Sequence, residues 1–333
     1  MGSGLANDAL GKVDYWLKGN DEQNFGDFLS AYLRDRMFLP IGVRAGQYRL
    51  IGSTIADFIL READEASAAE TNLRDRRVAF WGCGLRDASS LAPAWRAQAI
   101  ICGVRGPLSR DALGLPPSTP MADPGLLMPA LYAPAPCPHV MGRSIAIPHF
   151  HDRRDDSVLL GMAAADRLVR PNLPNAVGAM LAMVDAIAAA DFVLSASLHG
   201  AIIAAAYGVP FAYWDNGHLD LPFKWEDFAA SVAMPCAFAA TVAEGRRVHA
   251  AIIAPALRLP VLWPLLAVAP LAVRPEAALA IAAYEGHPVM TGYADLQAGI
   301  AAQAGYGATD DWVLAALRYR PAPRRRWWQI FWR

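Results

Sequence analysis

One histidine of this chain lies where a strand is expected to end and a helix to begin. An apolar, strand-like run ends at Ser195-Ala196-Ser197, and His199 follows it. Residues 201–207 are helix-like, and Gly208-Val209-Pro210 ends that segment. The first N–H groups of a helix lack intrahelical partners and its N-terminal end is positive, so this position favours an anionic ligand. A histidine beside a bound anion can carry a proton. A helix cap or a packed core side chain is an equally open reading of His199.

Arg105 and Asp27 also follow strand-like runs. Arg105 stands between an apolar run over 99–104 and a helix-like segment over 107–113. A guanidinium there can hold a carboxylate or a phosphate through two parallel hydrogen bonds, and an ordinary surface arginine is the alternative. Asp27 precedes a helix-like segment over 28–36. It is a candidate base or a ligand for a sugar hydroxyl, or else a first-turn carboxylate that only stabilises its helix.

The elements that would position these residues alternate along the chain. Apolar runs end in Gly-containing turns and helix-compatible segments follow, which predicts an α/β fold with mostly parallel sheets. Both halves share this rhythm, so we expect two Rossmann-like lobes facing across a cleft, as in GT-B proteins. Eight prolines between Pro116 and Pro138 suit the crossing between the lobes. The expected domains are residues 1–135, residues 140–235 with the anion site, and an Ala- and Pro-rich extension over 236–333.

In parallel sheets, ligands bind beyond the carboxyl ends of the strands. This rule places on the rim of the cleft the polar residues that directly follow strand-like runs, namely Asp27, Ser53, Cys83, Arg105, His149 and His199. Asn24 and Arg86 lie close to two of them in the sequence and are further candidates to line the cleft.

Neither a metal site nor a separate cofactor is expected. His149 and His151 would alternate across a strand end and point opposite ways, and no carboxylate cluster accompanies them. Asp152 and Arg153 are expected in a solvated loop. The sequence contains no dinucleotide-binding fingerprint, P-loop or nucleophile-elbow pattern, so those three chemistries lack support.

Bulk properties limit the partners and the compartment. A net charge of −1 gives no indication of nucleic-acid binding, and four widely spaced cysteines favour a reducing, cytoplasmic setting. No signal peptide is visible. The apolar run over 250–273 is broken by Arg258 and several prolines, so we expect packed segments there rather than a membrane helix. The tail over 324–333 mixes arginines with aromatic residues, which is typical of peripheral contact with an anionic membrane; a packed or unstructured tail is the alternative.

A set of short segments, taken in order, carries a resemblance to a known family. They are NFGD at 24–27, IGS at 51–53, WGCG at 81–84, RGPLS at 105–109, ADPG at 122–125, IPH at 147–149, and SLHG at 197–200 with YGVP at 207–210. Together they resemble the polysaccharide pyruvyl transferase family. The resemblance implies a fold like that of the GT-B glycosyltransferases. It also implies transfer of pyruvyl from phosphoenolpyruvate to a sugar of an exopolysaccharide or cell-surface glycan, which gives a ketal and releases phosphate.

The resemblance also implies where the donor binds. Arg105 and His199 match family positions that bind phosphoenolpyruvate, and Ser197, Leu198 and Gly200 flank the histidine. Some members carry arginine at the position of Ser197, so one anion contact is unassigned in this chain; Arg86 and Arg110 are the candidates to supply it.

These assignments give a mechanism as a hypothesis. We expect Arg105 to clamp the anion, and His199 to deliver a proton to the methylene carbon or to assist phosphate loss. Asp27 is expected to activate the acceptor hydroxyl. The expected partners are phosphoenolpyruvate and a free or lipid-linked glycan, with peripheral contact at the inner face of the cytoplasmic membrane. The alternatives are a GT-B glycosyltransferase with a nucleotide-sugar donor and a catalytically inactive glycan-binding or assembly protein.

Overall fold

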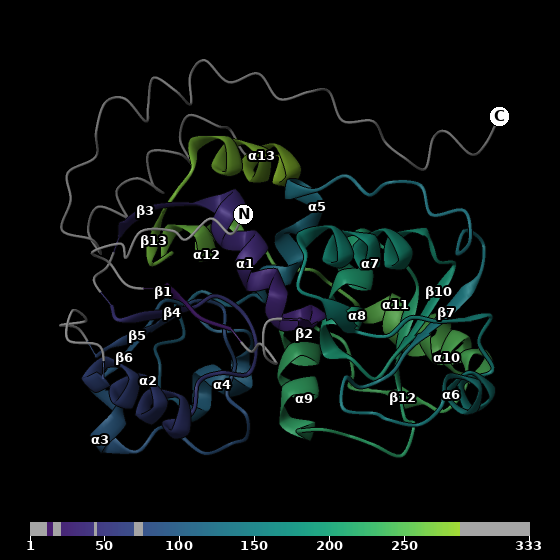
Figure 1. The fold of residues 1–333 in the computed structure, drawn as a ribbon, viewed down its shortest axis with the longest axis horizontal. Coiled ribbons are helices and arrows are strands. Elements are labelled where there is room, and N and C mark those ends of the chain that lie inside the picture. Colours follow the sequence, from purple (N-terminus) through teal and green to yellow (C-terminus); the bar gives the residue numbers. More distant parts are fainter. Residues whose placement is uncertain (1–11, 16–20, 43–44, 70–75, 287–333) are drawn as a thin grey trace.

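A first parallel sheet has the strand order β1-β4-β5-β6. The computed structural model describes residues 12–15, 21–42, 45–69 and 76–286 (Figure 1). The strands of this sheet are β1 (Lys12–Val13), β4 (Gln47–Arg49), β5 (Val78–Phe80) and β6 (Ala99–Ile101). Short bridges continue the parallel pairing beyond the strand ends, from Cys83 to Val104 and from Val104 to Met121. The loops at this carboxyl edge carry Ser53, Gly84 and Arg105.

A second parallel sheet has the order β12-β11-β10-β7-β8. Its strands are β7 (Ser144–Ile147), β8 (Arg167–Leu168), β10 (Phe192–Ser195), β11 (Phe211–Trp214) and β12 (Phe238–Ala239). The three central strands are buried along their whole length, as expected for a sheet covered on both faces. After β7 the chain adds β8 on one side, and it then adds β10, β11 and β12 on the other side, so the strand order reverses between β7 and β10. Such a switch point is where open α/β sheets bind their ligands.

Two antiparallel pairs join distant parts of the chain. β2 (Glu22–Asn24) pairs with β9 (Asn172–Pro174), and β3 (Phe38–Gly42) pairs with β13 (Leu271–Val273). Between β2 and β3 runs α1 (Phe25–Met37), which packs against α7 (Val177–Ala189), α8 (Leu198–Tyr207) and α13 (Pro275–Glu285). Helix α1 therefore contacts α7 and α8 as well as β1 of the first sheet.

The remaining helices lie before, between and after these strands in the sequence. They are α2 (Asp57–Ala69), α3 (Pro93–Arg96), α4 (Pro107–Ala112), the 3-10 helix η1 (Pro124–Leu127), α5 (Met128–Leu131), α6 (Asp156–Ala163), α9 (Pro222–Ser231), α10 (Val242–Val248), the π-helical turn His249–Ile253, α11 (Ala254–Ala256) and α12 (Trp263–Ala267). None of the helices in the described ranges is long and apolar enough to cross a membrane.

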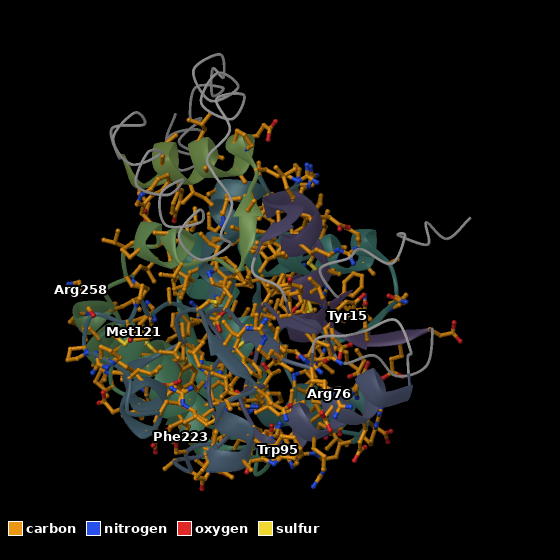
Figure 2. All side chains as sticks on the ribbon, turned by 90° about the vertical axis from the view of Figure 1, so that its left-hand side faces the viewer. Tyr15, Arg76, Trp95, Met121, Phe223 and Arg258 are labelled. Carbon is orange, nitrogen blue, oxygen red and sulfur yellow. The ribbon has the colours of Figure 1, made fainter. Side chains whose placement is uncertain are left out.

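Helix α9 lies between the two sheets in Figure 1. It packs on α4, and its Phe223 joins Trp95 at the border of the apolar cluster of the first sheet. Both rings lie along the lower edge of the face shown in Figure 2. On the other side, Trp225 contacts Tyr213 of β11 edge to face, with ring centroids 4.7 Å apart. One short helix thus connects both halves of the fold.

The predicted α/β fold with mostly parallel sheets is confirmed. The helix expected over 201–207 begins three residues earlier, because Ser197 adopts an extended conformation and serves as the N-cap of α8. The facing of two lobes across a cleft and the boundaries 1–135, 140–235 and 236–333 stay predictions. The basic-aromatic tail over 324–333 lies outside the described residues.

Candidate active site

His199 lies in the first turn of α8, directly after β10. Almost every residue of α8 is apolar and buried, which is typical of a helix covered on all sides. Only 11 % of the histidine side chain is exposed. Because β10 borders the switch point of the second sheet, the imidazole stands where this class of sheet binds ligands.

The ring of His199 packs against the start of α1. A Cβ at Gly26 would overlap with Nδ1 of His199, which is the ring atom nearest to that position. Glycine at position 26 therefore permits this close approach. As a consequence, Nδ1 faces the segment that also carries Asn24 and Asp27.

The opposite nitrogen of the ring faces a buried carboxylate. Nε2 of His199 lies 3.8 Å from Oδ2 of Asp123, and Asp123 is fully buried. The other oxygen, Oδ1, accepts a hydrogen bond of 2.8 Å from the backbone N–H of Gly125, which caps η1. Neither Nε2 nor Oδ2 has a hydrogen-bond partner within the described ranges. Two buried polar atoms thus face each other slightly beyond hydrogen-bonding distance.

Burial shifts both groups toward their uncharged forms. The pKa of His199 is lowered to about 3, first by burial and then by the positive charges of Arg105 and Lys224. The pKa of Asp123 is raised to about 6 by burial, against the attraction of Arg105. Of the two groups, Asp123 is therefore the one that takes up a proton near neutral pH.

Arg105 is fully buried between β6 and α4. Its Nη1 donates a hydrogen bond of 2.8 Å to Oγ of Ser53, and Nη2 lies 3.3 Å from Oδ2 of Asp227. A Cβ at Gly84 would overlap with the guanidinium. Nε of Arg105 is buried and has no acceptor in the described part of the chain. Ser53 and Asp227 thus hold the guanidinium in place, and some of its N–H groups can still donate hydrogen bonds to a ligand.

Two charged residues of α9 complete this region, and the sequence alone did not indicate them. Asp227 accepts hydrogen bonds from the backbone N–H and the hydroxyl of Ser109, besides its ion pair with Arg105. Lys224 lies one helical turn earlier, so it shares a face of α9 with Asp227. Its Nζ lies 2.7 Å from Oδ2 of Asp220, and only 12 % of its side chain is exposed. Burial lowers the pKa of Lys224.

Asp27 lies in the first turn of α1, where its Oδ2 accepts a hydrogen bond of 2.8 Å from Nδ2 of Asn24. Burial raises the pKa of Asp27, while the positive charges of Lys224 and Arg86 act in the opposite direction. The carboxylate is therefore within the electrostatic reach of the Arg105–Lys224 region, and its raised pKa suits a general base.

The prediction that His149 and His151 point opposite ways is wrong. β7 ends at Ile147, so the two residues lie in a turn, and their ring centroids are 5.3 Å apart. Nε2 of His149 lies 3.4 Å from Oδ2 of Asp220, the partner of Lys224, and the ring centroid of His218 lies 5.0 Å from that of His149. Hydrogen bonding to His149 is the main cause of the lowered pKa of Asp220.

The expectation of a solvated loop at Asp152 and Arg153 is wrong for Asp152. This carboxylate is buried, and it accepts hydrogen bonds from the side chains of Arg154 and Asn216. These polar partners stabilise the turn that follows β7.

The other predicted residues have defined places. Leu198 and Gly200 are buried in α8, and Ser197 caps it. Cys83 belongs to the apolar cluster of the first sheet; burial raises the pKa of its thiol to about 12, and its carbonyl accepts from the N–H of Arg105. Arg86 lies over the ring of Phe58, and Arg110 pairs with its neighbour Asp111.

A cavity of about 460 Å³ lies beside the β2–β9 pair. It is lined by Asp21, Glu22, Arg153, Arg170, Asn172, Leu173 and Pro174. Asn172 pairs in register with Asn24, the partner of Asp27. This polar cavity is therefore one strand away from the Asp27 carboxylate.

The assembled groups suit an anionic substrate that undergoes proton transfer. Arg105 and Lys224 supply buried positive charge, and the N-terminal N–H groups of α8 add theirs. Asp27, Asp123 and His199 can exchange protons. Within the described ranges no group of His, Cys, Asp and Glu side chains has a metal-binding arrangement.

Comparison with known proteins identifies the family. A family model described as "Polysaccharide pyruvyl transferase" matches residues 52–218, which is half of the chain. The chain belongs to the polysaccharide pyruvyl transferase family. The "Succinoglycan biosynthesis protein ExoV" of Rhizobium meliloti (strain 1021) is 27 % identical over 135 residues, which cover 40 % of this chain and 41 % of that relative. No solved structure matches the chain significantly.

The match to the pyruvyl transferase family spans only part of the site. Residues 52–218 include Arg105, Asp123 and His199, whereas Asp27 and helix α9 lie outside the range. Asp123 stands in one of the segments that carried the resemblance, but its type and position gave no role for it. Lys224 is one of only three lysines in the chain, and that rarity was the one available signal for it.

Proposed function

We propose that this member of the pyruvyl transferase family transfers the pyruvyl group of phosphoenolpyruvate to a glycan. The observation that carries the proposal is that two buried cations, Arg105 at the edge of the first sheet and Lys224 on α9, act electrostatically on His199 at the switch point of the second sheet. The charges of Arg105 and Lys224 both lower the pKa of His199, so the three groups share one electrostatic environment. Phosphoenolpyruvate carries a carboxylate and a phosphate, which need two cations or their equivalents.

The donor anion is held from both halves of the fold. Arg105 donates hydrogen bonds to the anion from the N–H groups that Ser53 and Asp227 do not use. The ammonium group of Lys224 leaves Asp220 and binds a substrate oxygen instead. The first N–H groups of α8, at Leu198, His199 and Gly200, receive the remaining anionic oxygens. In this proposal Lys224 supplies the anion contact that the position of Ser197 leaves unassigned; Arg86 and Arg110 do not.

The proposed reaction changes two carbons of phosphoenolpyruvate: C3 gains a proton, and C2 exchanges phosphate for two sugar oxygens. A proton is added to C3, so the C2–C3 double bond becomes a single bond and C2 becomes electrophilic. A sugar oxygen bonds to C2 and releases its proton to Asp27. The C2–O bond to phosphate then breaks, and a second sugar oxygen bonds to C2 while its proton leaves with the phosphate. Two hydroxyl protons thus balance one proton gained by C3 and one gained by phosphate.

The acceptor sugar is proposed to enter from the cavity beside β2 and β9. Asn24 orients Asp27 and pairs with Asn172, whose side chain lines that cavity. Charged and amide side chains suit a polyhydroxylated ligand. Substitution of Asn172 by Ala is expected to raise KM for the acceptor and to leave the affinity for phosphoenolpyruvate unchanged.

The setting in the cell is part of the proposal. The enzyme would act in the cytoplasm, where phosphoenolpyruvate would serve as the donor substrate without a separate cofactor. Contact of the arginine- and tryptophan-rich tail with the inner face of the membrane would bring it to a lipid-linked acceptor.

The test is incubation of the protein with phosphoenolpyruvate and a panel of free and lipid-linked oligosaccharides, followed by mass spectrometry. The proposal predicts an acceptor product heavier by one pyruvyl ketal, together with phosphate release. Nucleotide sugars should neither be consumed nor raise the melting temperature. Glycosyl transfer from a UDP- or GDP-sugar, with no pyruvyl product, would refute the proposal in favour of a glycosyltransferase.

A further inference from the structure

His199 cannot donate a proton as an ordinary imidazolium. Its pKa of about 3 leaves the ring neutral at neutral pH, because burial, Arg105 and Lys224 all disfavour a positive charge there. A neutral imidazole still carries one N–H, on either Nδ1 or Nε2. A neutral imidazole that gives up its Nδ1 proton must gain one at Nε2 to stay neutral. Its ability to act as an acid at Nδ1 therefore depends on a proton donor that faces Nε2.

The group that faces Nε2 is Asp123. We propose that Asp123 and His199 form a two-residue proton relay, in which Asp123 passes a proton to Nε2 while Nδ1 delivers one to the substrate. The inference rests on the proposed function for the identity of the proton acceptor. The geometry supports it: Nε2 and Oδ2 are both buried, both lack a hydrogen-bond partner in the described part of the chain, and lie 3.8 Å apart.

A shift of less than about 1 Å would bring the two atoms to hydrogen-bonding distance. Catalytic hydrogen bonds are often longer without substrate and tighten in the complex. Oδ1 of Asp123 is fixed by the N–H of Gly125, so Oδ2 is the oxygen left for the histidine. Nδ1 lies at the other end of the ring, against Gly26 and toward Asp27, where the sugar is proposed to enter.

The relay step balances in bonds and charge. The Nδ1–H bond of His199 breaks, and a C3–H bond forms with the electron pair of the C2–C3 double bond. In the same step the Oδ2–H bond of Asp123 breaks and an Nε2–H bond forms. His199 is neutral before and after the step, and Asp123 ends as a carboxylate. The proton that the first sugar hydroxyl leaves on Asp27 returns to the pair.

The charges around Asp123 and His199 determine the pH below which Asp123 carries the proton that the relay needs. Burial raises the pKa of Asp123 to about 6, Arg105 opposes this shift and Asp227 adds to it, while Arg105 and Lys224 act on His199. A bound anion adds negative charge beside Asp123 and raises its pKa further. Substrate binding therefore favours the protonated carboxyl that the relay needs.

The first test needs no substrate. Nitrogen-15 NMR of the histidine side chains in the full-length protein reports which ring nitrogen carries the proton. We expect the His199 proton to move from Nδ1 to Nε2 as the pH rises through about 6, with the ring neutral throughout. Asp123→Asn should abolish this change, because an amide does not ionise. A His199 ring that becomes an imidazolium near its ordinary pKa of 6.5 would overturn the relay.

The second test uses activity with a matched control. Asp123→Asn should lower kcat by about 10²–10⁴-fold with little change in KM for phosphoenolpyruvate. It should also abolish the decline in kcat/KM above about pH 6, because kcat/KM reports the pKa values of the free enzyme. Asp215→Asn is the control, since Asp215 is exposed and also accepts from an N–H two residues ahead, that of Gly217. A wild-type pH profile in Asp123→Asn would contradict the relay. A tautomer change without any pyruvyl product would refute the proposed function and still support proton exchange between the two residues.

Discussion

At the scale of single residues, the site consists of charged groups that are held out of water. Arg105 and Asp227 are both fully buried, and Lys224 is nearly so. Buried charges require paired partners, and here the partners leave some donor and acceptor atoms unused. Unused capacity of this kind in a buried cluster is where a polar ligand can gain the most from binding.

The role of Lys224 gives the first prediction. Lys224→Met removes one cation of the proposed donor site and keeps the length of the side chain. Loss of a charge-assisted hydrogen bond of about 1.5–3 kcal/mol corresponds to a loss of roughly 10–100-fold in affinity for phosphoenolpyruvate. Calorimetric titration measures this change. Arg110→Met is the control, because Arg110 pairs with the adjacent Asp111; weakened binding in that variant alone would refute the assignment.

The pKa shifts of Asp123 and His199 give a second prediction. The raised pKa of Asp123 contributes stability below about 3.8 that is lost as the pH rises through about 6. The lowered pKa of His199 contributes stability above about 6.5 that is lost as the pH falls toward about 3. Between pH 4 and 6 the two effects have opposite slopes.

The single variants should separate these slopes. In Asp123→Asn, the free energy of unfolding should rise more steeply from pH 4 to 6 than in the wild type; in His199→Gln it should rise less or fall. Denaturant titrations at a series of pH values measure the slopes. Equal slopes in all three proteins would show that neither group has a shifted pKa.

At the scale of elements, glycines set how closely a strand end or a helix can approach a charged side chain. A Cβ at Gly84 would overlap with the guanidinium of Arg105. Gly84→Ala should therefore displace Arg105 and weaken phosphoenolpyruvate binding by about tenfold or more, which is 1.4 kcal/mol. Gly178→Ala in α7 is the control, since nothing lies within 4 Å of the added carbon. Unchanged affinity in Gly84→Ala would mean that the position of Arg105 is not critical.

The elements also explain which parts of the site could be predicted. Alternation of strands and helices identified the parallel sheets, and the strand-end rule brought attention to Arg105 and His199. Helix α9 could not be identified in this way, because Lys224 and Asp227 lie within a helix and follow no strand directly. The opposite orientation predicted for His149 and His151 is wrong because β7 ends at Ile147, before either histidine. Burial, which decides the roles of Asp123 and His199, depends on contacts between distant segments.

At the scale of the whole molecule, a few buried polar contacts join the two sheets and the segments after them. Asp227 joins α9 to Ser109 and Arg105, and the indole N–H of Trp81 donates to the carbonyl of Leu265 at 2.8 Å. The part of the predicted 236–333 extension that the structure describes contributes β12 to the second sheet and β13 to the pair with β3. Stability and site geometry are thus coupled across the chain.

Asp227→Ala tests this coupling. It leaves the buried Arg105 without its carboxylate, so the free energy of unfolding should fall by about 3–5 kcal/mol. Asp191→Ala is the control: its pair with Arg246 is exposed, and its loss should cost less than about 1 kcal/mol. Equilibrium denaturation measures both values. A similar, small loss in the two variants would show that the buried pair does not hold the halves together.

The most direct measurement of the central claim is a crystal structure of the protein with phosphoenolpyruvate. The ligand is predicted to lie with its anionic groups between Arg105, Lys224 and the first turn of α8, and with its methylene carbon facing Nδ1 of His199. Phosphoenolpyruvate bound elsewhere, with Arg105 and His199 making no contact with it, would contradict the account.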